Sequence, residues 1–117
     1  MAYVDGFLIA VPTANKEKYR ALAEMAAAVF KDHGALKVVE CWGDDVPEGK
    51  VTSFPMAVKR KDDETVLFSW ILWPSREARD AGNKKVMEDE RMKSHGHEMP
   101  FDGQRMIFGG FEVLLER

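Results

Sequence analysis

Residues 65–73 read TVLFSWILW, a run that is apolar at nearly every position. A strand with one face in water alternates apolar and polar side chains, so a strand of this composition must be covered on both faces. Helices of the same chain can cover one face, and a second copy of the protein is the simplest cover for the other. The run therefore predicts a central strand in a homodimer that packs sheet on sheet.

The remaining predicted elements place this strand third among four strands. Strands are predicted over residues 3–11, 36–42, 65–73 and 105–115. A first helix is predicted to begin at a cap, Thr13 or Asn15, and to end at His33-Gly34, and a second helix is predicted over residues 76–91. The resulting βαββαβ order is the ferredoxin-like arrangement, an α+β fold with two helices on one face of an antiparallel sheet. Because the other face needs a partner, two such sheets packed together predict a dimeric α/β barrel.

Local signals refine this outline. Apolar side chains follow one helical stripe between residues 16 and 33 at Tyr19, Leu22, Ala23, Ala26, Val29 and Phe30. Ser53-Phe54-Pro55 predicts a capped short helix over Phe54 to Lys59, with a strand as the alternative. The small residues of the second helix, Gly82 among them, suit a close approach to the sheet. Gly109-Gly110 predicts a bulge or the close approach of another backbone or a ligand.

Composition limits the class of protein. With 117 residues the chain is expected to form a single domain over residues 1–117. A formal net charge of -3, with basic residues scattered among acidic ones, argues against nucleic-acid binding. No apolar run is long enough to span a bilayer, and the one cysteine, Cys41, is typical of a reducing compartment. We therefore expect a cytoplasmic protein that binds neither nucleic acid nor membrane.

A family resemblance rests on five segments. They read YVDGF (3–7), HGAL to ECWGDD (33–45), VTSF (51–54), ETVLFSW (64–70) and MPFDGQRMIFGGFE (99–112). With these segments in this order, essentially the whole chain resembles the YbaA-like bacterial proteins, a family catalogued as a domain of unknown function. The resemblance implies the same dimeric α/β barrel. It implies no reaction and no catalytic residues, because none is established for that family.

Polar residues inside apolar strands are the best candidates for a site. Asp5, Glu40, Ser69, Arg105 and Glu112 interrupt otherwise apolar strands. A carboxylate that faces the helices is costly unless it is paired, and Arg105 is an available bidentate partner. Surrounded by aromatic side chains, such a cluster would form a small-molecule pocket. The predicted ligand-binding residues are Glu40, Trp42, Ser69 and Arg105; the alternative is that they line the dimer interface or face solvent.

Other reactive side chains have simpler explanations. His95-Gly96-His97, with Glu98 and Asp102 nearby, has a spacing that metal ligands can use, but a polar loop explains it better because no third fixed ligand is evident. We therefore predict no metal. His33 suits the C-terminal end of a helix. Cys41 suits a buried small hydrophobic side chain better than a reactive thiolate, because no neighbouring cation or base is implied.

Two functions remain open from the sequence. The first is a homodimer that binds a small organic molecule between sheet and helices without a cofactor. The alternative is a cofactor-independent enzyme of monooxygenase, isomerase or lyase type, which rests on analogy with other dimeric α/β barrels. No motif identifies a substrate, so the sequence leaves the question of an enzyme undecided.

Overall fold

The computed structural model describes residues 1–94 and 99–117. Its strands are β1 (Tyr3–Pro12), β2 (Lys37–Trp42), β3 (Glu64–Trp73) and β4 (Ile107–Glu112), and its helices are α1 (Lys16–Asp32), α2 (Phe54–Ala57), α3 (Arg76–Glu88) and α4 (Glu90–Lys93). Short 3₁₀ turns over Thr13–Asn15 and Gly103–Arg105 precede α1 and β4. Among the described helices none is long and apolar enough to cross a bilayer.

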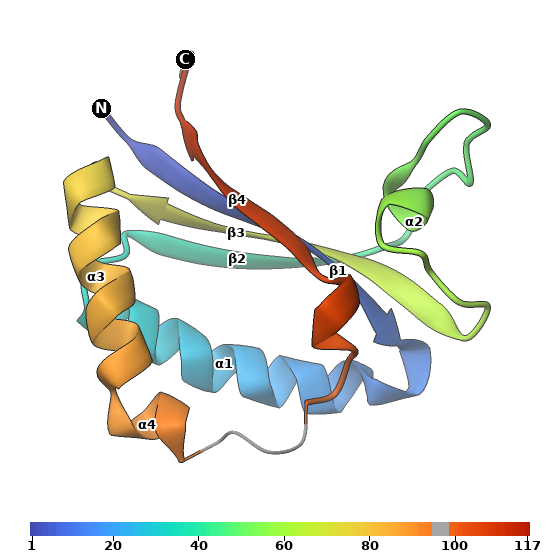
Figure 1. Ribbon diagram of the computed structural model, residues 1–117, viewed down its shortest axis with the longest axis horizontal. Helices are drawn as coiled ribbons and strands as arrows, with labels where there is room; N and C mark the ends of the chain where they lie inside the picture. Colours follow the sequence, from blue (N-terminus) through green and yellow to red (C-terminus); the bar gives the residue numbers. More distant parts are fainter. Residues whose placement is uncertain (95–98) are drawn as a thin grey trace.

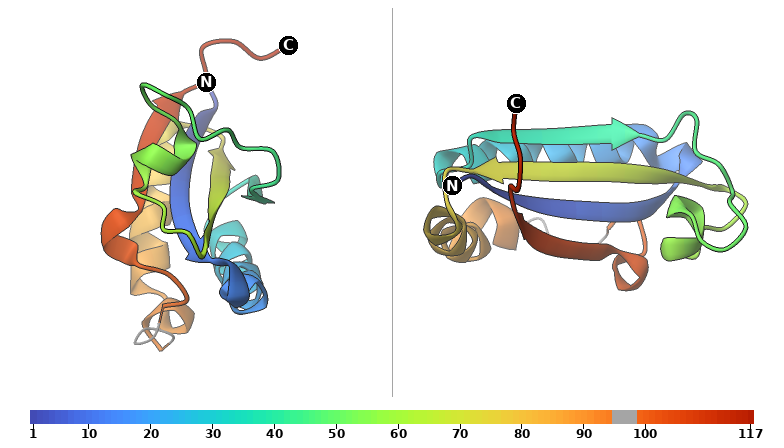
Figure 2. Two further views of the ribbon diagram at one scale, coloured as in Figure 1. Left: turned by 90° about the vertical axis from the view of Figure 1, so that its right-hand side faces the viewer. Right: turned by 90° about the horizontal axis from the view of Figure 1, so that it is seen from above.

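The four strands form one antiparallel sheet in the order β2-β3-β1-β4. Figure 2 shows this order from above, with β3 and β1 at the centre. In Figure 1, α1 and α3 lie on the same side of the sheet, α1 along the strands and α3 at the end where the chain termini lie. This arrangement confirms the predicted ferredoxin-like α+β fold.

The face of the sheet toward the helices holds most of the core. Side chains alternate along each strand, so Leu67, Ile71 and Trp73 of β3 point toward the helices. Leu67, Trp73 and the α1 residue Val29 are almost completely buried. Phe30 of α1 meets the Trp73 ring edge-on, with 6.2 Å between ring centroids. The predicted stripe of α1 therefore does face the sheet.

The opposite side of the sheet, here called the open face, is apolar and largely uncovered in the single chain. It carries, on alternate positions, Val4, Leu8, Val39, Cys41, Phe68, Trp70, Leu72, Ile107 and Phe111. Phe68 is 46% exposed and Phe111 is 60% exposed. Among the described residues, Val58, just after α2, covers one end by packing on Ala10 and Val66. The prediction that Cys41 is buried is wrong for the single chain, because it lies on this exposed side.

The side-chain cap predicted at Ser53 is present, whereas the one predicted before α1 is not. The Ser53 hydroxyl accepts a hydrogen bond from the Met56 amide at 3.0 Å, which confirms a helix rather than a strand after Ser53. Ser75 caps α3 in the same way. Asn15 precedes α1, but its side chain does not cap the helix. Instead its Nδ2 donates to the Pro100 carbonyl oxygen at 2.9 Å, which ties the segment before β4 to the start of α1.

The second predicted helix is interrupted at Asp89. The Asp89 carboxylate accepts a hydrogen bond from the Arg91 amide at 2.9 Å and so starts α4 as a separate turn. It also lies 2.8 Å from Nε2 of His33, at the C-terminal end of α1. The break therefore lies where side-chain contacts to another helix replace continued helical hydrogen bonding. The predicted place of His33 at a helix end is confirmed.

The last strand is shorter than predicted and has no bulge. Gly109 and Gly110 pair in regular register with Gly6 and Asp5, so the predicted bulge is absent. A side chain on Gly110 would collide with the Tyr3 hydroxyl and the Arg79 guanidinium. Gly110 therefore gives room to these neighbouring side chains.

Candidate functional site

A cavity of about 310 Å³ lies between α1 and the sheet. Its walls are the apolar side of α1 and the helix-facing side of β1, β2 and β3, and four methionines contribute to its lining. We call it the inner cavity; it is lined by Phe7, Ile9, Tyr19, Leu22, Ala23, Met25, Ala26, Ala27, Phe30, Val38, Glu40, Ser69, Ile71, Met92, Met99, Phe101 and Met106. A hollow this apolar, with few polar groups, has the composition of a small-molecule site.

A second hollow of about 390 Å³ lies between α1 and β2. We call it the outer groove; it is lined by Lys16, Glu17, Tyr19, Arg20, Ala23, Glu24, Ala27, Val38, Glu40, Trp42 and Leu67. Five residues line both hollows, and Tyr19 and Glu40 are the polar ones among them. The Tyr19–Glu40 pair therefore lies where the two hollows adjoin.

Glu40 is the carboxylate of this site. Its Oε1 accepts a hydrogen bond from the Tyr19 hydroxyl at 2.7 Å. Ser69, directly opposite Glu40 on the neighbouring strand, supplies a second hydroxyl. Glu40 is exposed as a residue, yet the protein atoms packed around its carboxyl group displace part of the water there and raise its pKa, while the two hydrogen bonds act in the other direction. The carboxyl group of Glu40 therefore keeps its proton to a higher pH than an ordinary surface glutamate does.

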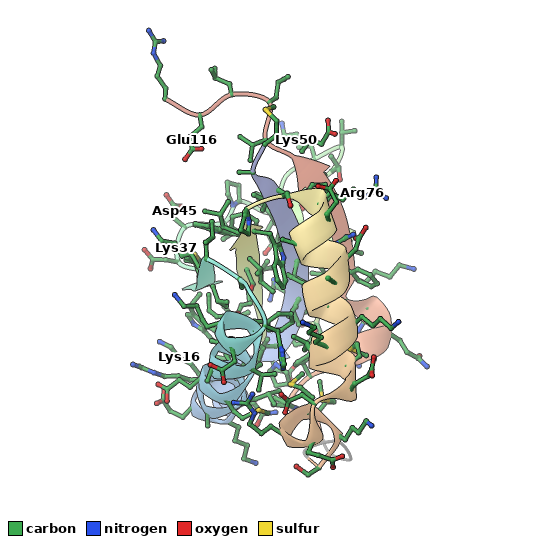
Figure 3. The ribbon with its side chains drawn as sticks, turned by 90° about the vertical axis from the view of Figure 1, so that its left-hand side faces the viewer. Lys16, Lys37, Asp45, Lys50, Arg76 and Glu116 are labelled. Atoms are coloured by element: carbon green, nitrogen blue, oxygen red, sulfur yellow. The ribbon has the colours of Figure 1, made fainter. Side chains whose placement is uncertain are left out.

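Aromatic rings flank this carboxylate. Burial, with the hydrogen bond to Glu40, raises the pKa of Tyr19, so its hydroxyl stays protonated and donates. The Tyr19 ring lies 5.8 Å from that of Phe101, measured between centroids. On the outer side, the Lys16 ammonium lies 5.3 Å from the centroid of the Trp42 ring. Figure 3 shows Lys16 beside α1 and Lys37 at the start of β2, among the charged side chains that project outward.

Three of the four predicted ligand-binding residues lie together. Glu40 and Ser69 line the inner cavity, and Glu40 and Trp42 line the outer groove. Arg105 lies apart: its guanidinium pairs with both carboxylate oxygens of Glu64, at 2.8 and 2.6 Å, and donates to the Lys59 carbonyl oxygen at 2.9 Å. The predicted pairing of Arg105 with Glu40, Asp5 or Glu112 is thus not seen among the described contacts, because Arg105 precedes β4 in a 3₁₀ turn.

Asp5 has a different arginine as its partner. The Asp5 side chain is buried, as predicted for a carboxylate on the helix side of the sheet. Arg79 of α3 donates to it from Nε at 3.0 Å and from Nη2 at 2.9 Å, and the Trp73 indole donates at 3.0 Å. This group joins α3 to the sheet and lines neither hollow.

Sequence reasoning missed Tyr19 as a polar member of the site. It lies on the predicted apolar stripe of α1, and a tyrosine there brings a hydroxyl that needs a hydrogen-bond partner near the sheet. That requirement could have pointed to Glu40, one of the few polar residues in the strands. The methionines of the cavity wall gave no such signal, because methionine in a core is ordinary.

The described residues offer no metal centre. Among residues 1–94 and 99–117 there is no group of three histidine, cysteine, aspartate or glutamate side chains placed to hold an ion. His95, His97 and Glu98, whose spacing metal ligands can use, lie outside the described residues.

Comparison with known proteins gives close relatives of unknown function. The chain is 59% identical over 116 residues to uncharacterized protein YbaA of Escherichia coli K12, and equally to that of Shigella flexneri, with 99% of each chain covered. The family described as "Protein of unknown function (DUF1428)" matches residues 2–103.

Solved structures with low sequence identity share the fold. A variant of MhuD with two manganese protoporphyrin IX molecules bound per active site superposes with a TM-score of 0.63 at 18% identity, covering 98% of this chain and 97% of that one. A dimeric ferredoxin-like protein from an uncultured marine organism gives 0.61 at 12% identity over the full length of both chains. A variant of SnoaB, a cofactor-independent oxygenase from Streptomyces nogalater, gives 0.56 at 14% identity, covering 98% and 95%.

The structural likenesses agree with the fold described above, and the sequence match extends over almost the whole chain. The chain therefore belongs to the DUF1428 family of proteins of unknown function, together with YbaA.

Proposed function

We propose that this protein is a homodimer that binds a small, largely apolar organic molecule in the inner cavity. The observation that carries the proposal is an apolar cavity of about 310 Å³ with one hydrogen-bonded carboxyl group, that of Glu40, in its wall. Ligand sites are typically clefts of roughly 300–1,000 Å³ with few, well-placed polar groups. The inner cavity is at the small end of this range, and the adjoining outer groove adds room.

Binding can be tested with the neutral fluorescent probe N-phenyl-naphthylamine. Ala26 lines the inner cavity, whereas Ala28 lies on the exposed side of the same helix. We expect Ala26→Leu to weaken probe binding at least tenfold, because the added carbons occupy the cavity, and Ala28→Leu to leave it unchanged. Circular dichroism shows whether both variants are folded. Equal binding by the two folded variants would contradict a site in the inner cavity.

The dimer proposal rests on the open face. A contiguous apolar sheet surface of this kind is unusual on a protein that works as a single chain. Two copies joined through it would cover the second side of β3, as its composition requires, and a protein of the same fold is described as dimeric. α1 and α3 lie on the other side of the sheet, so they would leave the open face accessible to a partner (Figure 1).

Sedimentation velocity tests the dimer. Phe68→Asp introduces a charge on the open face, where Phe68 is 46% exposed, and Met87→Asp introduces the same charge on α3, where Met87 is 72% exposed. We expect Phe68→Asp to shift the protein to single chains and Met87→Asp to sediment as the wild type does. A wild-type protein that sediments as a single chain at micromolar concentration would refute the dimer.

A second candidate function is cofactor-independent catalysis, and one observation favours it. The raised pKa of Glu40, in a hollow and beside the Tyr19 hydroxyl, is the arrangement used for general acid–base chemistry. A compound that binds the wild type would be incubated with it in air and followed by mass spectrometry. Product from the wild type but not from Glu40→Gln would support an enzyme; an unchanged compound would support binding alone.

We place the protein in the cytoplasm, since a lone cysteine suits a reducing compartment. Fractionation of cells that express it at its natural level would test this location.

A further inference from the structure

The carboxylates of this fold differ in their partners. Asp5 pairs with Arg79 and Glu64 pairs with Arg105, each through more than one hydrogen bond. Glu40 is different. Within residues 1–94 and 99–117, the groups that bond its carboxylate are the hydroxyls of Tyr19 and Ser69, and no cationic side chain forms an ion pair with it.

The surroundings of Glu40 combine an apolar compartment with features that attract a cation. Apart from Tyr19 and Ser69, the described side chains that line the inner cavity with Glu40 are aliphatic, aromatic and thioether groups. Toward the outer groove lies the Trp42 ring, over which the structure already holds an ammonium group, that of Lys16. Ring faces attract cations through their quadrupole, most strongly where water is partly excluded. The groove is lined by three acidic and two basic residues, and Arg20 pairs with Glu24 at 3.5 Å.

We propose that the ligand is an organic cation, an amine with an apolar body, whose ammonium group pairs with the Glu40 carboxylate while the body fills the inner cavity. This inference rests on the proposed function, since it assigns the chemical class of the molecule bound there. The Tyr19 and Ser69 hydroxyls hold the carboxylate in place and leave acceptor positions on its oxygens for the ligand.

The electrostatics favour a cation over a neutral or anionic isostere. Loss of water around Glu40 raises its pKa, which means that its negative charge is poorly compensated by the protein. A cation that arrives beside the carboxylate supplies the missing compensation, whereas an anion adds a second negative charge. Both an ammonium and a hydroxyl can donate to the carboxylate, but only the ammonium adds the attraction of an opposite charge, which should improve affinity by about tenfold to a hundredfold.

Three molecules of nearly the same shape test the inference: phenylbutylamine, phenylbutanol and phenylbutyrate. Isothermal titration calorimetry would be run with the full-length wild type, with Glu40→Gln and with Glu88→Gln. The last variant removes the same charge from the exposed end of α3, away from both hollows. We expect the amine to bind the wild type and Glu88→Gln about tenfold to a hundredfold more tightly than the alcohol. The acid should bind most weakly, and Glu40→Gln should lose the preference.

The outcomes separate this inference from the proposed function. If the alcohol or the acid binds the wild type as tightly as the amine, or if folded Glu40→Gln keeps the preference, the inference is wrong. It is equally wrong if the amine fails to bind while N-phenyl-naphthylamine still binds in a manner sensitive to Ala26→Leu. In each of these cases a ligand site in the cavity stands. Failure of the neutral probe to bind at all overturns the proposed function itself.

Discussion

Replacing Gly82 by alanine sets two effects of opposite sign against each other. Gly82 lies inside α3, where alanine is favoured over glycine by about 0.8–1.0 kcal/mol. An added Cβ, however, would lie 2.6 Å from Cη2 of Trp73 and 2.7 Å from the His33 carbonyl oxygen. Neither neighbour can yield easily, because the Trp73 ring is completely buried and the oxygen belongs to the backbone.

The steric effect should prevail. Overfilling a packed core costs about 1–3 kcal/mol, and the contact with a backbone atom places this site toward the upper part of that range. After the gain in helix propensity is subtracted, we expect Gly82→Ala to lower the free energy of unfolding by about 1–2 kcal/mol. Urea denaturation followed by far-ultraviolet circular dichroism measures this change, with all variants at one protein concentration because association affects apparent stability.

A double-mutant cycle tests the cause. Trp73→Phe removes the outer ring atoms that the new Cβ would meet. In that background the contact with the His33 carbonyl oxygen remains, so Gly82→Ala should still destabilise but by less than in the wild type, with a coupling energy of about 0.5–2 kcal/mol. A Gly82→Ala single variant that is more stable than the wild type would refute the close packing of α3 on Trp73. Equal effects of Gly82→Ala in both backgrounds would show that Trp73 is not the obstacle.

Two further predictions concern charged groups. Arg79→Ala leaves the Asp5 carboxylate buried without its cation and should lower the free energy of unfolding by about 2–4 kcal/mol. This range is at the lower side of the values for fully buried ion pairs, because a fifth of the Arg79 side chain is exposed. Adding Asp5→Asn should recover part of this loss in the same denaturation assay, and no recovery would argue against the pair. The pKa of Glu40 is raised above the ordinary 4.5, so the folded state favours the protonated carboxyl group. The stability that this protonated group contributes is fully present below pH 4.5 and is lost as the pH rises through the pKa of the folded state. Glu40→Gln should therefore lose less stability than the wild type when the pH is raised from 4.5 toward neutrality, and parallel profiles from urea titrations at several pH values would contradict this.

The strands and α1 could be predicted because their signals are local and strong. The run of residues 65–73 has the composition of a central strand, and α1 repeats its apolar side chains with a helical period. Ser53-Phe54-Pro55 predicted α2 because a capping residue and the helix that it caps are neighbours in the chain.

Features that depend on distant contacts could not be predicted in this way. Glu88-Asp89-Glu90 is compatible with a continuous helix, and the break at Asp89 accompanies its contact with His33, 56 residues earlier. The partner of Asp5 could not be chosen from the sequence, because several arginines were available and Arg79 reaches it only once α3 lies on the sheet. The candidate site could be predicted only in part. Glu40 and Ser69 lie in strands that the sequence predicted, and they are opposite each other in the sheet. The position of Arg105 depends on the path of the chain before β4, which the sequence did not reveal.

Cys41 gives this protein a built-in reporter. It is the single cysteine of the chain and lies on the open face, exposed in the isolated subunit. If two subunits associate through that face, a thiol-modifying dye can reach the sulfur only when they separate. The labelling rate would then measure the lifetime of the pair, and a cavity ligand that slows labelling would reveal that the two sides of the sheet communicate.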